Sequence, residues 1–231
     1  MNALLNAHTK RGYNRSPHIG LTSNVLPEIR SGVSDKSSQA GVSSDYIPKA
    51  NHQWYVLRVT YNRNAKALGI ISSANVESYI PMHYVIKKEI GKKKRILKPL
   101  LPNLFFVYAT REAVEAIIKK KDGELSVIKY YLDKTKPLEN NGKHPPLTIP
   151  FAAMMNFMKA TSTSSDHVRI VSSEQCHYKS GDMVRVIEGE FKGTIGRVAR
   201  IAGQQRVVVE VSGLCLVATA YIPTDFIEII R

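Results

Sequence analysis

The pattern of apolar and polar positions changes abruptly at Trp54. Residues 1–50 are rich in Ser, Gly, Asn and Pro and sustain neither a helical nor an alternating apolar period, so we predict a flexible extension there. After them, aromatic or β-branched runs alternate with helical apolar stripes. The predicted elements are strands at 54–60, 76–81, 104–109 and 125–132, a hairpin with arms at 82–90 and 93–97, and helices at 63–75, after Thr110 and after Pro150.

The order of these elements indicates one α+β sandwich over residues 51–160. Residues 161–177 begin with a small polar stretch that is typical of a linker. Residues 178–231 then show a different pattern, in which β-branched runs are separated by glycines at intervals of ~8–12 residues. This spacing predicts a small β-barrel. We therefore expect an extension, a sandwich, a linker and a barrel, in that order.

Positive charge is concentrated in one part of the chain. The 231 residues include 33 Lys and Arg against 19 Asp and Glu, a formal net charge of +14. Residues 51–100 carry ten of the basic groups and only two of the acidic ones, and the surplus peaks on both sides of Gly91. Glycine suits the turn of the predicted hairpin because a positive φ costs it nothing. A basic surplus of this size indicates a polyanionic partner.

Neither membrane insertion nor secretion is indicated by the sequence. No apolar run approaches the ~20 residues that a membrane helix needs, and the first residues lack the apolar core of a secretory signal. Cys176 and Cys215 are too few for a disulfide framework or a four-ligand zinc site. We expect a cytoplasmic protein in a reducing compartment.

The sequence also lacks the residue patterns of an enzyme. The pairs Asp166-His167 and Cys176-His177 are isolated. Gly189–Gly193 lacks the GxxxxGK[ST] spacing of a phosphate-binding loop and lies between predicted strands. We therefore expect a binding protein with no catalytic residue, no cofactor and no metal.

Two motifs resemble those of a known family. Segments within Gly181–Val198 resemble the KOW motif. Trp54–Val56 and Pro99–Val107 resemble the N-terminal domain of NusG transcription elongation factors. Trp54–Tyr61 and Lys98–Asn103 look closest to the specialised UpxY antiterminators, which act on capsular polysaccharide operons in gut Bacteroidales. The resemblance implies a NusG-type sandwich, with an antiparallel sheet and flanking helices, followed by an SH3-like barrel.

The resemblance implies that the N-terminal domain binds the clamp helices of the β′ subunit of RNA polymerase, holds the clamp closed and suppresses pausing and premature termination. Rigid aromatic and proline groups would supply the apolar concavity that grips such a protruding coiled coil. The residues expected to bind polymerase are Trp54, Tyr79, Pro81, Leu101, Pro102, Leu104 and Phe105. The competing interpretation is that they fill the core of the sandwich.

The resemblance also implies contacts with upstream duplex DNA or the non-template strand, and it leaves nascent RNA open as a further partner. The residues expected to bind nucleic acid are Arg63 and Lys66 at the start of the first helix, and Lys92, Lys93, Lys94 and Arg95 at the hairpin tip. Each would neutralise phosphates and make the affinity salt-dependent. The competing interpretation of the lysine run is a solvated surface turn.

Further partners stay open. A contact with the polymerase β-subunit gate loop would fall at Glu115–Ile117, which departs from the polar tripeptide of one class of relatives. In the barrel we expect partner contacts at Phe191 and at Leu214, which stands where NusG has a partner-binding phenylalanine, so binding of Rho or of a ribosomal protein is not decided. We expect a monomer. The alternatives are a ribosome-associated or RNA-binding KOW protein and a general housekeeping NusG.

Overall fold

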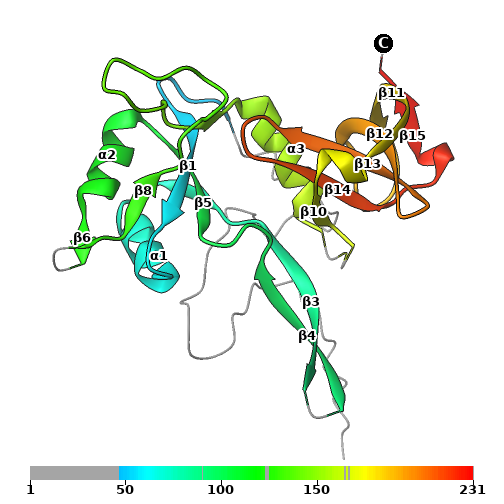
Figure 1. Cartoon of the computed structure of the whole chain (residues 1–231), viewed down its shortest axis with the longest axis horizontal. Coiled ribbons are helices and arrows are strands. Elements are labelled where there is room, and N and C mark those ends of the chain that lie inside the picture. The colour runs from blue at the N-terminus through cyan, green and yellow to red at the C-terminus, as the bar shows by residue number, and fades with distance from the viewer. Residues whose placement is uncertain (1–46, 90, 123–124, 164, 166, 231) are drawn as a thin grey trace, which may run out of the picture.

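The computed structural model of the chain describes residues 47–89, 91–122, 125–163, 165 and 167–230. It consists of a mixed α/β part followed by a β-rich part, and a long hairpin projects from the first (Figure 1). The expected α+β class is thereby confirmed. The predicted flexible extension lies outside the described residues, apart from residues 47–50.

The N-terminal sheet is built on β1 (Gln53–Val59), and all its strand pairings are antiparallel. β1 pairs with β5 (Leu104–Ala109) on one side, and with β8 (Ile128–Tyr130) and β9 (Thr148–Ile149) on the other. β2 (Glu77–Tyr79) lies at the edge, beside β5. Most residues of β1 and β5 are buried, which explains why these strands are largely apolar in the sequence.

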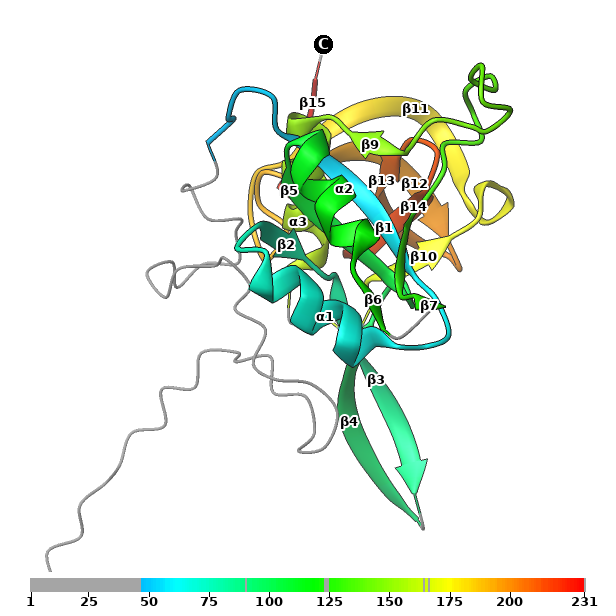
Figure 2. The ribbon, with the colours of Figure 1, turned by 90° about the vertical axis from the view of Figure 1, so that its left-hand side faces the viewer.

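Helices cover both faces of this sheet (Figure 2). α1 (Asn64–Ser73) and α2 (Arg111–Lys119) bury their apolar residues against one face, in a cluster that includes Phe105 of β5. α3 (Phe151–Thr161) buries its apolar side against the other face, in a cluster that includes Trp54 of β1. Neighbouring residues of one strand thus belong to different cores, because side chains alternate across a strand.

Local sequence accounts for the helix ends. The Thr110 hydroxyl caps α2 by accepting a hydrogen bond from the backbone N–H of Ala113 at 3.4 Å, as predicted. α2 ends at Lys119. Pro150 has an extended ψ of 141° and is the N-cap residue of α3, so the helix begins at Phe151.

The strand predicted at 125–132 is divided. β7 (Leu125–Ser126) pairs with β6 (Lys121–Asp122), whereas β8 pairs with β1. The backbone N–H of Thr60 donates to the carbonyl of Val127 at 2.9 Å, between the two pieces. The chain therefore changes partner at this point instead of continuing one ladder.

The β-rich part is a curved, barrel-like sheet with the strand order β10-β14-β13-β12-β11-β15, which confirms the predicted β-rich domain. Its strands are β10 (Arg169–Val171), β11 (His177–Val186), β12 (Ile195–Ile201), β13 (Gln204–Val211), β14 (Cys215–Tyr221) and β15 (Ile227–Ile229). Two short 3-10 helices, η1 (Ser173–Gln175) and η2 (Thr224–Phe226), lie between them.

β10 is a difference from the sequence prediction. It lies within residues 161–177, which we predicted to be a linker, and it pairs with β14 through Ile170 opposite Val217. The sheet therefore begins before residue 178. The run Arg169–Val171 is only three residues long and follows a polar stretch, so its strand character is decided by the pairing and not by its own pattern.

α3 connects the two parts of the protein. On one side it contacts β1, and on the other it contacts β13 and β14 (Figure 1). Met154 and Phe157 of α3 are fully buried, in one apolar cluster that includes Phe106 of the N-terminal sheet and Val207 of the barrel. A single apolar core therefore runs through the helix from one sheet to the other.

A side-chain amide adds a directional contact between α3 and the barrel. The Asn156 amide nitrogen donates to the Ile195 carbonyl at 2.6 Å, and the Ile195 N–H donates to Asn156 Oδ1 at 2.7 Å. The Asn156 amide and the backbone of Ile195 therefore satisfy each other's hydrogen-bonding groups, as two paired backbone segments do. This contact fixes the orientation of the barrel on the helix in a way that apolar packing alone does not.

Replacing Asn156 with leucine should loosen the barrel from α3. The Ile195 N–H and carbonyl would lose their hydrogen-bond partners, which should lower the free energy of unfolding by about 1–3 kcal/mol. We expect faster amide hydrogen exchange at Ile195 and in β12 in Asn156→Leu. Ala152→Leu, at an exposed position of the same helix, is the control and should leave exchange unchanged. Identical exchange in both variants would contradict the docked arrangement.

Candidate functional site

A tight turn links the hairpin to β5. The Leu104 N–H donates to the Leu101 carbonyl at 3.4 Å, and Pro102 and Asn103 occupy the two central positions. Asn103 has a φ of 61°, which a type II turn requires at its third residue. Pro102, at the second position of the turn, has its own φ fixed by its ring, and asparagine at the third position tolerates the left-handed region. The Pro-Asn pair therefore determines the shape of this turn.

The same turn is held by two other segments. The Asn103 carbonyl accepts a hydrogen bond from the Val59 N–H at 2.8 Å, and its side-chain oxygen accepts one from the Asn64 amide at 3.0 Å. The turn is thus bonded to the end of β1 and the start of α1. It presents Pro102 to solvent, with Leu101 and Leu104 half-buried beside it.

The other residues expected to bind polymerase are buried. Trp54 has no exposed surface, and Tyr79, Pro81 and Phe105 are also in the interior. Trp54 and Phe105 lie on opposite faces of the sheet. The seven predicted residues therefore do not form one surface here, and the accessible ones are those of the turn.

Tyr79 is one of these buried residues, and a hydrogen bond fixes its side chain. Its hydroxyl shares a hydrogen bond of 2.7 Å with the Thr161 hydroxyl at the end of α3, where either oxygen can donate. Burial raises the pKa of Tyr79 above its usual range. The side chain therefore fixes β2 to α3 as a neutral hydrogen-bonding group.

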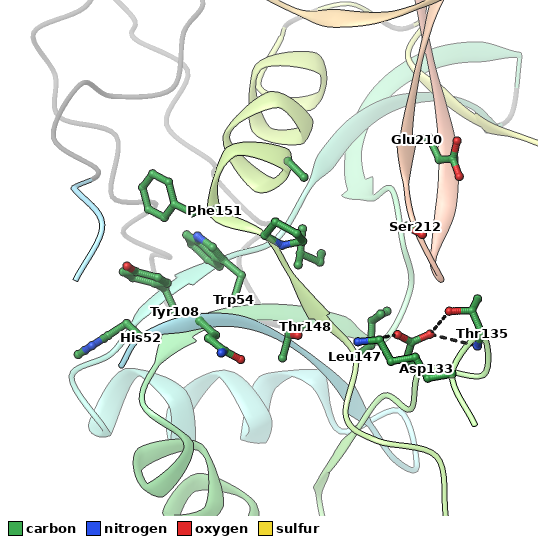
Figure 3. Close-up of a pocket in the computed structure, with 15 residues that line it drawn as sticks. His52, Trp54, Tyr108, Asp133, Thr135, Leu147, Thr148, Phe151, Glu210 and Ser212 are labelled. Atoms are coloured by element: carbon green, nitrogen blue, oxygen red, sulfur yellow. Dashed lines mark hydrogen bonds and ion pairs between the residues drawn. The ribbon is translucent and has the colours of Figure 1, made fainter. Parts of the chain in front are cut away.

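An aromatic cluster lines a cavity of about 500 Å³ between the N-terminal sheet and the barrel (Figure 3). The Trp54 and Tyr108 rings are stacked, with centroids 5.2 Å apart, and Tyr108 also contacts His52 and Phe151 at 5.4 and 5.7 Å. Sequence reasoning did not single out His52, Tyr108 or Phe151. They meet because Tyr108 lies directly opposite Trp54 in the β1–β5 register, which the sequence does not reveal.

At the opposite wall of the cavity, a loop of the barrel lies against the N-terminal domain. Asp133 accepts hydrogen bonds from the Thr135 hydroxyl and N–H at 2.6 and 3.1 Å, which hold the pKa of its carboxyl below its usual value. A Cβ on Gly213, between β13 and β14, would lie 3.0 Å from Asp133 Oδ1 and 3.1 Å from Leu147. A side chain at this position would push these two groups aside by a few tenths of an ångström, and the φ of 75° at Gly213 is one that L side chains rarely adopt.

The predicted partner residues of the barrel lie close to this junction. Phe191 is buried in the apolar cluster that both domains share. Leu214 follows Gly213, is half-buried and packs against the same cluster. In this arrangement the loop expected to bind partners is in contact with the N-terminal domain.

The hairpin forms a sheet of its own, which we call the ribbon: β3 (Met82–Glu89) and β4 (Lys92–Pro99). The two strands meet at Gly91, whose φ is 74°, as predicted. Figure 2 shows that the ribbon extends away from the rest of the protein. Its predicted nucleic-acid-binding residues, Lys92, Lys93, Lys94 and Arg95, are all exposed.

The other predicted basic pair lies at the start of α1. Arg63 is the N-cap residue and is half-buried, with its guanidinium carbon 5.9 Å from the centre of the Tyr61 ring. Lys66 is exposed in the first turn, which carries no acidic residue. The Asn64–Asn103 hydrogen bond ties this positive helix end to the turn that follows the ribbon.

Comparison with known families decides the identity. The model of transcription termination factor nusG matches residues 52–170, and the KOW motif model matches residues 180–210. The chain belongs to the NusG family. The comparison with curated proteins found no match.

NusG proteins are non-enzymatic transcription factors that act on elongation and termination, and they generally interact with RNA polymerase. Two further findings concern the described residues. These residues contain no group of three or more His, Cys, Asp or Glu residues that could hold a metal ion. Among the same residues, none of the helices has the length and apolar character to cross a membrane. Burial raises the pKa of Cys215 to about 12, so its thiol is a poor nucleophile.

The segment matching the gate-loop contact of some NusG relatives offers little exposed surface. Glu115 forms an ion pair with Arg111 at 3.1 Å, one turn away, and Ile117 is buried under the sheet. Only Ala116 of the three is fully exposed. A gate-loop contact therefore stays a prediction with few side chains to make it.

The pKa of His83, near the base of the ribbon, should lie below 6.5. Burial lowers it first, and the charge of Lys98 directly across the ribbon lowers it further. Because the folded state holds this proton less tightly than the unfolded chain, the free energy of unfolding should fall as the pH drops through 6.5. An NMR titration of His83 should show a depressed pKa that rises only in part in Lys98→Ala. A pKa at or above 6.5 in the native protein would contradict this environment.

Proposed function

We propose that this NusG-family protein binds RNA polymerase through its N-terminal domain, on the clamp helices of the β′ subunit, and suppresses pausing and premature termination. The observation that carries the proposal is the turn of Leu101–Leu104. Pro102 is exposed, with Leu101 and Leu104 half-buried beside it. Asn103 is bonded to two other segments, through its carbonyl and through its side chain, and the turn directly follows the basic ribbon. A rigid apolar contact beside a basic arm suits a surface where polymerase meets DNA.

We also propose that the ribbon and the start of α1 contact the nucleic acid of the transcription complex. Support comes from the exposure of Lys92, Lys93 and Lys94 and from the position of Lys66 at a helix N-terminus without acidic residues. These groups neutralise phosphates and orient the protein. They carry no sequence preference of their own.

The finer assignment that we propose is antitermination at capsular polysaccharide operons. Its support is the resemblance of Trp54–Tyr61 and Lys98–Asn103 to UpxY proteins. Leu214 adds to it, because leucine keeps an apolar contact but lacks the aromatic ring through which NusG barrels bind partners. A factor that opposes termination has no need to recruit Rho.

Charges placed in the turn should abolish polymerase binding. For the double variant Leu101→Asp with Leu104→Asp we expect at least a tenfold, and roughly a thirtyfold, loss of affinity for elongation complexes, because each carboxylate would be buried at the contact. Readthrough at pauses and terminators should fall in parallel in transcription with the cognate polymerase. Circular dichroism and a thermal melt check that the variant is folded.

The matched control is Leu138→Asp, since Leu138 is 59% exposed in a loop of the same domain. It should bind polymerase like the native protein. Unchanged affinity and readthrough in a folded turn variant would refute the proposal. A pull-down from native cells that recovers ribosomes without polymerase would instead favour the ribosome-associated alternative.

A further inference from the structure

We infer that the ribbon enters the major groove of duplex DNA, and that Arg95, which lies over the ring of Tyr84, reads base edges there. This inference rests on the proposed contact with nucleic acid and deepens it, because phosphate contacts by lysines give affinity without sequence choice. Its basis is the geometry of one face of the ribbon.

The shape of the ribbon fits a groove. Two antiparallel strands of eight residues each stand away from the body with no other strand in their sheet. At ~3.4 Å per residue they reach roughly 27 Å. The major groove of B-form DNA, about 12 Å wide, admits a two-stranded ribbon. The major groove of A-form RNA is deep and narrow, so the shape favours DNA over an RNA helix.

The charges of the ribbon call for a polyanion. Lys87 lies directly opposite Lys94, and Lys88 directly opposite Lys93. Like charges in directly opposed positions destabilise a strand pair. Because successive pairs point to opposite faces, both faces of the outer half are positive. Phosphates along both walls of a groove would relieve this repulsion and stabilise the tip.

One face carries more than charge. The Arg95 guanidinium lies 3.8 Å from the centre of the Tyr84 ring, within stacking distance. Stacking restricts the plane of a guanidinium, and the N–H groups at the edge of a guanidinium form a rigid fork that matches the O6 and N7 acceptors of guanine. A lysine has no such fork. Arg95 is thus preorganised to discriminate between bases, unlike the lysines beside it.

Ile86 lies on the same face of the ribbon as Arg95. It lies directly opposite Arg95 and is 56% exposed, so an apolar side chain projects from the middle of a basic surface. Phosphate binding gives it no role, whereas the major groove presents the methyl group of thymine to apolar side chains. Arg95 and Ile86 together would read a short step that contains a G·C and an A·T pair.

The test uses the full chain without polymerase. Short DNA duplexes with a randomised centre are selected for binding and sequenced, and affinities for the selected and scrambled duplexes are measured at several salt concentrations. We expect the native protein to prefer a G-containing step about tenfold or more. Arg95→Lys should lose this preference but keep its affinity for scrambled DNA, because the charge is retained.

The matched control is Lys93→Ala. This variant should weaken binding to all duplexes alike and reduce the slope of log affinity against log salt concentration by about one, because one phosphate contact is lost. The sequence preference should stay intact. The inference is overturned if the native protein selects no sequence, if Arg95→Lys keeps the preference, or if single-stranded DNA or an RNA hairpin binds more tightly than the duplex. Polymerase binding by the Leu101 and Leu104 variants is measured separately, so either idea can fail alone.

Discussion

The packing of α3 between two sheets is the constraint on which this structure depends. Met154 and Phe157 are fully buried because the N-terminal sheet covers one side of the helix and the barrel covers the other. Asn156 then bonds to the backbone of Ile195. A helix that belongs to both cores sets the position of the barrel, in contrast to two modules joined only by a tether.

This constraint also arranges the surfaces that we propose to face partners. With α3 and the barrel on one face and α1 and α2 on the other, the sheet leaves the turn at Pro102 and the ribbon accessible. The loop at Gly213 lies against Asp133, so the barrel surface expected to bind partners faces the N-terminal domain. The turn at Pro102, the ribbon and the barrel loop at Gly213 therefore have fixed positions relative to one another.

The sequence was sufficient for the elements whose patterns are local. The apolar runs of β1 and β5, the Thr110 cap and the turn at Gly91 follow from residue types alone. Features set by long-range pairing were not accessible. β10 is a strand because of β14, and the Trp54–Tyr108 stack depends on strand register. Trp54 resembled a docking residue, but its neighbours in space make it a core residue in this structure.

The turn after the ribbon is the surface that we propose to bind RNA polymerase. Pro102 is exposed, so a photo-activatable amino acid can replace it without opening the core, and Leu138 provides an exposed reference position. After irradiation of transcribing complexes, we expect cross-links from position 102, and none from 138, to the largest polymerase subunit. Equal labelling from both positions, or labelling of ribosomal proteins alone, would contradict it.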